Sequence, residues 1–280
     1  MLTGVSKTAI LTLRARADEH ARPDRVFVDP LAAEWWSRVE WPIELDAWYS
    51  PEAQYALAFR ADDIDRIVAR YLTTLDAPAT VIELGCGLST RQSRLSSLSI
   101  EQWIDLDLDA VVAQRRAWGA GGAGGARHRH VASSVLDHRW MDEVSGDPRH
   151  QVFIAEGLLY YLPRAEVDAL LSAMRRRFSG AAMLIDVLGA NDYPTLLKNT
   201  QAVGTPVAWK LEGDYADVLS SFGLAVVPEF EPDRLMSDML KRYWDRLDAK
   251  MRGAIYFARH SELVWRGRSG NILGRLTTDR

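Results

Sequence analysis

Cysteine is almost absent from this chain, and this absence limits the classes of protein to which it can belong. Cys86 is the single cysteine among 280 residues, so no internal disulfide can form. Long apolar runs are lacking as well, since no stretch approaches the ~18–20 residues that span a bilayer. The first twenty residues alternate apolar and charged residues and do not resemble a signal peptide. These absences predict a cytoplasmic protein without a membrane span.

Basic residues are not in excess, and lysine is scarce. The chain has five lysines and twenty-nine arginines, and its net charge is -4. A nucleic-acid-binding protein uses a strong basic field, which this charge does not provide. Apolar residues make up 48% of the chain and charged residues 26%, which is ordinary for a globular enzyme of one elaborated domain. We therefore expect a small-molecule partner, with neither nucleic acid nor membrane involved.

The first part of the chain, residues 1–78, shows helical patterns. Apolar residues recur at helical spacing over residues 5–17, and Asp29-Pro30 is typical of a helix start. A second long helix is expected over about residues 51–75. We predict that residues 1–78 form a helical lid segment over a core that comprises residues 79–280.

In the core, short β-prone runs alternate with helical stretches, which is typical of βαβ units and a parallel sheet. The predicted strands are Thr80–Leu84, Gln102–Leu106, one ending at Val131–Ala132, Val152–Ala155, Ala182–Val187, Leu224–Val227 and Glu262–Arg266. The predicted helices are Arg91–Ser97, Leu108–Trp118, Ser134–Glu143, Arg164–Phe178, Tyr215–Phe222 and Arg234–Met251. The fold class is therefore α/β, with a mostly parallel, seven-stranded sheet. An insertion at about residues 189–213 is expected to cover the substrate.

The main chemical signal is the run V-I-E-L-G-C-G-L-S-T-R, residues 81–91. Gly85 and Gly87 follow a strand, so the backbone can turn sharply and a ligand can approach closely. The three-glycine dinucleotide fingerprint is incomplete, because Thr90 stands where the third glycine would fall. Glu83, two residues before the first glycine, suits a site that holds the cationic amino group of S-adenosylmethionine. The run therefore favours a methyltransferase over a nicotinamide-dependent enzyme.

Acidic residues also stand at two other strand ends. Asp107 follows the second strand and can accept two hydrogen bonds from a ribose diol, or it can belong to a solvent-facing strand end, Asp105-Leu106-Asp107. Glu156 follows the fourth strand, and its alternative role is to cap the next helix. Ligands of doubly wound sheets bind at the carboxyl ends of the strands. The acids at the three strand ends are therefore expected to face one crevice.

Together these motifs resemble the leucine carboxyl methyltransferase family, including its bacterial branch of tetracenomycin-type polyketide O-methyltransferases. The resemblance covers nearly the whole chain and rests on residues 8–20, 25–32, 58–65, 82–91, 103–107, 134–140 and 156–162. It implies a Rossmann-like class I methyltransferase fold and the cofactor S-adenosylmethionine, with S-adenosylhomocysteine as its product.

The resemblance also assigns cofactor-binding residues. Arg60 matches the family's arginine for the cofactor carboxylate, and a planar guanidinium suits that bidentate contact. Asp107 matches the ribose-binding acid. The remaining matches are Gly85 and Gly87 in the turn, Ser134 and Val135 beside the adenine, and Glu156 with Gly157 near the methionine portion. The chain departs from the family at Ser134, where aspartate is common, at Asp109, where proline is usual, and at Tyr160, where methionine is common.

No catalytic residue can be assigned from the sequence. A carboxylate acceptor is ionised at neutral pH and needs no general base, whereas a hydroxyl needs one. No histidine stands at a predicted strand end in the crevice, which favours carboxyl methylation of a small acidic metabolite. Hydroxyl methylation and carboxyl methylation of a protein C-terminus stay as alternatives. Tyr161, Tyr193 and Trp209 are candidate acceptor-binding residues, and packing roles are equally open to them.

Other signals have simpler interpretations. Gly119–Gly125 lacks the lysine of a phosphate-binding loop and is interpreted as a surface loop. His128 and His130 have no third ligand at suitable spacing, so we expect solvated side chains and no metal. Cys86 has no histidine to activate it, which favours packing in the turn. Two further alternatives for the whole protein are a nicotinamide-dependent oxidoreductase and a cofactor-binding protein without activity.

Overall fold

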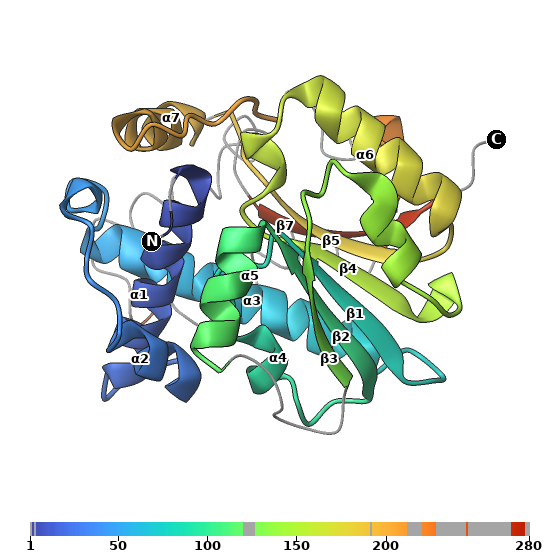
Figure 1. Ribbon diagram of the computed structural model, residues 1–280, viewed down its shortest axis with the longest axis horizontal. Helices are drawn as coiled ribbons and strands as arrows, with labels where there is room; N and C mark the ends of the chain where they lie inside the picture. Colours follow the sequence, from blue (N-terminus) through green and yellow to red (C-terminus); the bar gives the residue numbers. More distant parts are fainter. Residues whose placement is uncertain are drawn as a thin grey trace.

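A central sheet of seven strands organises the structure, which is a computed structural model and describes residues 2, 4–119, 127–190, 192–211, 220–227, 245 and 270–277 (Figure 1). The strands are Ala79–Leu84 (β1), Ile100–Asp107 (β2), Arg127–Ala132 (β3), Gln151–Ala155 (β4), Ala182–Val187 (β5), Leu224–Val226 (β6) and Gly270–Leu276 (β7). Their order is β3-β2-β1-β4-β5-β7-β6, and β7 runs antiparallel to both of its neighbours. The predicted Rossmann-like, mostly parallel sheet is confirmed.

Helices cover both faces of this sheet (Figure 1). The α-helices are Thr8–Ala21 (α1), Pro30–Trp36 (α2), Pro51–Leu72 (α3), Arg91–Arg94 (α4), Asp109–Ala117 (α5), Arg164–Arg177 (α6) and Tyr193–Ala202 (α7). The 3-10 helices are Gly4–Lys7 (η1), Ile43–Leu45 (η2), His138–Glu143 (η3), Pro148–His150 (η4) and Leu159–Tyr161 (η5). Asp29 and Ser50 cap α2 and α3 by accepting hydrogen bonds from Ala32 N and Ala53 N, and each cap precedes a proline.

The alternation of side chains along the strands separates two apolar layers. Val81, Trp103 and Ile154 pack in one cluster with residues of α3, among them Ile64 and Val68. The strand residues between them, such as Ile82, Ile104 and Phe153, pack in a second cluster with residues of α6 and η3. The same alternation continues to the carboxyl ends of the strands. It predicts that acidic side chains lie on the α3 face of the sheet, namely Glu83, Asp105, Asp107 and Asp186.

Two predicted helices are shorter in the structure, and serine explains both. The helix expected over Ser134–Glu143 is reduced to η3, because Ser134 Oγ accepts a hydrogen bond from Leu136 N and forms a turn instead. The helix expected over Arg91–Ser97 ends at Arg94, and just beyond it Ser96 Oγ donates to Ser93 O. Side-chain hydrogen bonds to the backbone thus compete with the helix at both positions.

The C-terminal part differs most from the sequence-based expectation. Strand β7 was not predicted, because Gly270 and Gly274 interrupt its apolar pattern. A Cβ atom at Gly274 would lie 3.3 Å from Ala225 O, so glycine lets β6 and β7 pair closely. The predicted strand Glu262–Arg266 lies outside the described residues, as do most of the predicted helices Tyr215–Phe222 and Arg234–Met251. Within the described part of the chain, no helix combines the length and apolar character needed to cross a membrane.

Candidate active site

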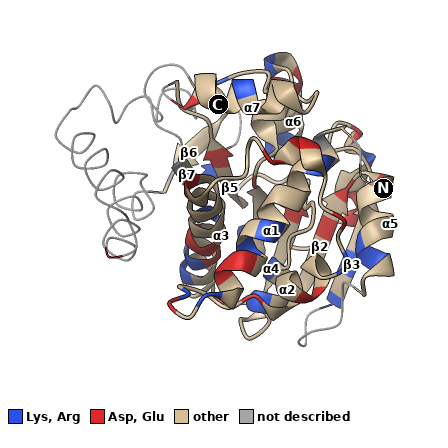
Figure 2. Cartoon of the chain, turned by 90° about the vertical axis from the view of Figure 1, so that its left-hand side faces the viewer, with Lys and Arg blue, Asp and Glu red and all other residues tan. Residues whose placement is uncertain are grey.

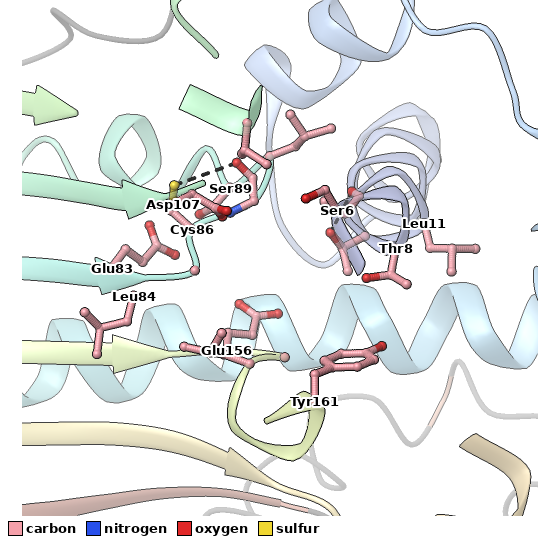
Figure 3. Close-up of a pocket in the computed structure, with 18 of the residues that line it drawn as sticks. Ser6, Thr8, Leu11, Glu83, Leu84, Cys86, Ser89, Asp107, Glu156 and Tyr161 are labelled. Atoms are coloured by element: carbon pink, nitrogen blue, oxygen red, sulfur yellow. Dashed lines mark hydrogen bonds between the residues drawn. The ribbon is translucent and has the colours of Figure 1, made fainter. Parts of the chain in front are cut away.

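A cavity of about 420 Å³ lies at the carboxyl ends of β1, β2 and β4, where parallel α/β sheets bind ligands. Residues of η1, α1 and α3 close its opposite side, and in Figure 3 Ser6 and Thr8 lie across from Glu83, Cys86 and Asp107. All nine predicted cofactor-binding residues line this one cavity: Arg60, Glu83, Gly85, Gly87, Asp107, Ser134, Val135, Glu156 and Gly157. The first and last of these nine residues, Arg60 and Gly157, lie 97 positions apart in the sequence.

The turn after β1 requires its two glycines. Gly85 and Gly87 have φ angles of +62° and +50°, in the left-handed region that side chains disfavour. A Cβ atom would lie 2.9 Å from Leu158 Cδ1 at Gly85 and 3.1 Å from Ala9 Cβ at Gly87. Cys86 between them is buried, and burial raises the pKa of its thiol well above the ordinary value. The thiol is therefore protonated at neutral pH, which agrees with a packing role.

The backbone holds the Asp107 carboxylate in place. Oδ2 accepts a hydrogen bond of 2.7 Å from Gly87 N, and Oδ1 accepts one of 2.7 Å from Leu108 N. Burial raises the pKa of Asp107, although these two hydrogen bonds oppose the shift. Each oxygen retains a second lone pair. The carboxylate is thus ready to accept two hydrogen bonds at the cavity wall.

Arg91 joins three carboxylates beneath the cavity, a role that the sequence analysis missed. Its Nε lies 2.6 Å from Asp65 Oδ1, its Nη2 lies 2.6 Å from Glu156 Oε2, and its Nη1 contacts Glu83 Oε1. The Arg91 side chain is 1% exposed. Arg91 ends the glycine motif in the sequence, but its partners come from α3, β1 and the end of β4. Sequence spacing gave no sign that these elements meet.

Arg60 connects the same network to β5. Its Nε donates to Glu156 Oε1 at 2.8 Å, and its Nη1 donates to Asp186 Oδ2 at 3.2 Å. Burial alone would raise the pKa of Glu156, but the guanidinium groups of Arg60 and Arg91 outweigh it and lower the pKa to about 2. Glu156 therefore stays ionised, and it forms ion pairs instead of the helix cap considered as an alternative. Gly157 N donates to Asp186 Oδ1 at 2.8 Å and fixes the following turn.

The free polar atoms of this cavity fit S-adenosylmethionine. Glu83 Oε2 is buried and has no hydrogen-bond partner among the described residues, so it leaves an acceptor for a cationic group. Burial raises the pKa of Glu83, although Arg91 opposes the shift. Arg60 Nη2 makes no hydrogen bond to the described part of the chain and is available for a carboxylate. Together with Asp107, these groups match the ammonium, the carboxylate and the ribose diol of the cofactor.

The other half of the cavity is mostly apolar. Its walls include Trp48, Leu57, Tyr161 and Leu196, with the hydroxyl groups of Ser6, Thr8 and Thr12 on η1 and α1. Burial raises the pKa of Tyr161 to about 12, so its hydroxyl is protonated at neutral pH. Arg16 and Arg60 are the basic residues of the described lining, and both are in ion pairs. This half therefore offers a ligand apolar walls and hydroxyl groups, and its described lining has no unpaired basic residue.

Two of the three predicted acceptor-binding residues do not line the cavity. Tyr193 and Trp209 pack in an apolar cluster that includes Tyr161 and Leu196, and they lie behind these two lining residues. Trp209 Nε1 donates to Leu159 O at 2.7 Å. Lys210 Nζ lies 5.3 Å from the centre of the Tyr193 ring. A direct contact of Tyr193 or Trp209 with the acceptor stays a prediction, whereas Tyr161 faces the cavity.

The prediction of solvated histidines at positions 128 and 130 is wrong. Their side chains are 4% and 8% exposed and lie against Asp105, which is itself fully buried. Asp105 is also not part of a solvent-facing strand end, which was the alternative for this segment. The error arose because spacing along the chain cannot reveal a partner on the neighbouring strand. The pairing of β2 with β3 places Asp105 beside His130.

Known proteins with similar sequences are methyltransferases. The tetracenomycin polyketide synthesis O-methyltransferase TcmP of Streptomyces glaucescens is 29% identical over 187 residues, which cover 67% of each chain. An S-adenosyl-L-methionine-dependent methyltransferase of Gibberella zeae, dpfgK, is 27% identical over 228 residues, covering 75% of this chain and 76% of that protein. The cofactor of this chain is accordingly S-adenosylmethionine, and nothing in these relatives favours the nicotinamide-dependent alternative.

Solved structures share the fold at low sequence identity. A DUF574 family protein from Streptomyces avermitilis superposes with a TM-score of 0.57 at 14% identity, covering 94% of this chain and 96% of that one. Magnesium protoporphyrin IX methyltransferase from Synechocystis, with bound S-adenosylhomocysteine, gives 0.50 at 12% identity, covering 88% and 94%. A sequence model of leucine carboxyl methyltransferase matches residues 9–175, which is more than half of the chain. The chain therefore belongs to the leucine carboxyl methyltransferase family and is an S-adenosylmethionine-dependent methyltransferase.

Proposed function

We propose that this protein transfers a methyl group to a carboxylate oxygen of a small, largely apolar acidic metabolite, such as a polyketide acid. The observation that carries this proposal is the acceptor half of the cavity, around Tyr161, Leu196 and Thr8. Among its described residues, no histidine or lysine is present to remove a proton. The cavity acids lie in the cofactor half: Glu156 contacts two arginines, Glu83 contacts Arg91 and keeps one oxygen for the cofactor, and Asp107 accepts backbone hydrogen bonds and faces the ribose. An acceptor that is ionised at neutral pH needs no base.

The residues of the chain then act by positioning. The cofactor supplies a methyl group that its sulfonium already activates. Glu83, Arg60 and Asp107 bind and orient the cofactor, and Tyr161 and Leu196 direct the acceptor oxygen toward it and exclude water. Holding two reactants in line can be worth an effective molarity of about 10⁵ M or more. In the proposed reaction these residues act by positioning alone, and no catalytic acid or base is required.

The relatives support the same acceptor class. The S. glaucescens relative is named for O-methylation in polyketide synthesis. An apolar cavity with a few hydroxyl groups suits a flat polyketide acid better than a flexible charged peptide, because peptide binding requires backbone hydrogen-bond partners. Methylation of a hydroxyl group and methylation of a protein C-terminus are the competing outcomes of the test.

The test has two stages. Calorimetric titration with S-adenosylmethionine, S-adenosylhomocysteine and NAD first checks cofactor binding, and we expect the first two to bind and NAD not to bind. The enzyme is then given an aromatic polyketide carboxylic acid, its carboxamide with free phenols, and a peptide that ends in leucine. We expect a methyl ester from the first compound alone, recognised by its release in mild alkali. A base-stable ether from the carboxamide, or methylation of the peptide, would replace the proposal with the corresponding alternative.

A further inference from the structure

A second cluster of ionisable side chains lies between β2 and β3, outside the cofactor cavity. The pairing of the two strands aligns Asp105 with His130 and Trp103 with His128. Side chains aligned in this way, and those two residues apart on one strand, share a face of the sheet. Figure 2 shows β2 and β3 side by side, with α5 next to them. The cluster of Asp105, His128 and His130 does not line the cavity and has no part in the proposed reaction.

The three side chains converge. His128 Nε2 lies 2.6 Å and His130 Nε2 lies 3.7 Å from Asp105 Oδ2. One ligand atom from each residue can be chosen so that all three lie within 4.8 Å of one another. The three side chains are 0%, 4% and 8% exposed. This spacing is close to that of ligand atoms around one metal ion, and small shifts are enough to admit the ion.

The hydrogen bonds of the cluster are incomplete. His130 Nε2 and His128 Nδ1 are buried and have no hydrogen-bond partner among the described residues, which is unusual for buried polar atoms. A ligand that accepts an electron pair, as a metal ion does, would give His130 Nε2 the partner that it lacks.

Neighbouring side chains fix the orientation of the Asp105 carboxylate. Trp103 Nε1 donates to Asp105 Oδ1 at 2.9 Å, and Arg115 Nη2 contacts Oδ2. Such outer partners orient a metal-binding carboxylate, which has four lone pairs for its contacts. Arg115 also donates to Gly87 O at 3.0 Å and to Ser89 O at 2.5 Å. The cluster is therefore connected, through one side chain, to the glycine turn of the cofactor cavity.

We propose that Asp105, His128 and His130 form a binding site for a divalent transition metal ion of the Zn²⁺ class. The ion takes the place of the hydrogen between His128 Nε2 and Asp105 Oδ2, and this proton is released to solvent or moves to His128 Nδ1. His130 Nε2 becomes the third ligand, and water completes the coordination. Two imidazoles and one carboxylate suit Zn²⁺, Co²⁺ or Ni²⁺ better than Mg²⁺, which prefers oxygen ligands. Because β3 is the edge strand of the sheet, the bound ion joins this edge to β2.

The experiment measures metal binding directly, so it does not depend on the proposed methyl transfer. Full-length protein without a histidine tag is freed of metal with a chelator and titrated with Zn²⁺ alone, then with Mg²⁺. We expect one Zn²⁺ per chain, a higher melting temperature with Zn²⁺, and at least tenfold weaker binding in His130→Ala. His150→Ala is the matched control, because His150 pairs with a single carboxylate, Asp76 at 2.6 Å, on the surface. That variant should bind as the wild type does.

Each outcome decides the proposal. Equal Zn²⁺ affinity in wild type and His130→Ala, equal losses in His130→Ala and His150→Ala, or no Zn²⁺ binding at all would overturn it. If His130→Ala does not fold, the Co²⁺ form of the wild type decides. Visible absorption bands typical of nitrogen-ligated Co²⁺ support the site, and a spectrum identical to that of aqueous Co²⁺ contradicts it.

Discussion

The two halves of the cavity are built in opposite ways. The cofactor half is made of strand ends, and its acids are fixed by arginines and backbone amides, such as Arg91 with Glu156 and Gly87 N with Asp107. The acceptor half is made of helices from distant parts of the chain, and it has apolar walls with hydroxyl groups. The cofactor is always the same molecule, which favours a rigid and charged binding site. Single apolar substitutions can change the shape of the acceptor half and leave the cofactor half intact.

The largest expected effect comes from removing the buried Arg91 guanidinium, which connects the acids of the cofactor half. Arg91→Met leaves Asp65, Glu83 and Glu156 in a buried position without their shared cation. Removing one partner of a buried ion pair typically costs about 3–5 kcal/mol, and we expect a loss of unfolding free energy of at least that size. Urea denaturation followed by circular dichroism measures it. Arg139→Met is the control, since Arg139 pairs with Asp137 on the surface and should show no measurable change. Similar stabilities for both variants would contradict the role given to Arg91.

The next effect separates cofactor binding from stability. Asp107→Ala removes the carboxylate that we expect to accept hydrogen bonds from the ribose. A hydrogen bond to a charged group is worth about 1.5–3 kcal/mol, so the affinity for S-adenosylhomocysteine should fall roughly 10–100-fold. Calorimetric titration measures this change. Asp109→Ala, two residues further on and exposed, should bind as the wild type does. An unchanged affinity in Asp107→Ala would remove the ribose contact from the assignment.

Much of the cofactor half could be predicted from the sequence, because its residues follow strands at regular positions. An acid stands at or next to the carboxyl end of three strands, at Glu83, Asp107 and Glu156, and parallel strands bring such ends together. Arg91 could not be recognised in this way. Its partners are fixed by the packing of α3 and α4 against the sheet, and the sequence pattern carries no signal for that packing. The cluster of Asp105, His128 and His130 was missed for the same reason, since strand pairing brings these residues together.

The acceptor half was much harder to predict. Tyr161 lies within a family motif and faces the cavity, whereas Leu57 and Leu196 look like ordinary apolar residues of α3 and α7. Aromatic residues of the insertion were preferred as acceptor contacts because aromatic side chains often line ligand pockets. In the structure, Tyr193 and Trp209 pack behind the wall. Which side of a helix or loop faces a cavity depends on tertiary packing, and a local pattern does not determine it.

A change in the acceptor half should spare the cofactor. Leu196→Phe adds bulk to the cavity wall, and overpacking typically costs about 1–3 kcal/mol. We expect kcat/KM for the acceptor to fall about tenfold, with an unchanged affinity for S-adenosylhomocysteine. Gln201→Phe adds the same ring at an exposed position of the same helix and should leave both quantities unchanged. Parallel losses of acceptor turnover and cofactor affinity in Leu196→Phe would show that the two halves are not separable.

The smallest expected effect concerns Trp209 and Tyr193, which pack behind the lining residues Tyr161 and Leu196. It tests whether they contact the acceptor directly or only support the lining. Trp209→Phe keeps an aromatic ring but loses the hydrogen bond from Nε1 to Leu159 O, which is worth about 1 kcal/mol. If Trp209 only supports Tyr161 and Leu196, the variant should lose about that much stability, and KM for the acceptor should change less than in Leu196→Phe. Tyr193→Phe is the companion variant, and it should affect KM even less because its ring packing is kept. A KM increase in Trp209→Phe larger than that in Leu196→Phe, at unchanged cofactor affinity, would instead support direct contact between the insertion and the acceptor.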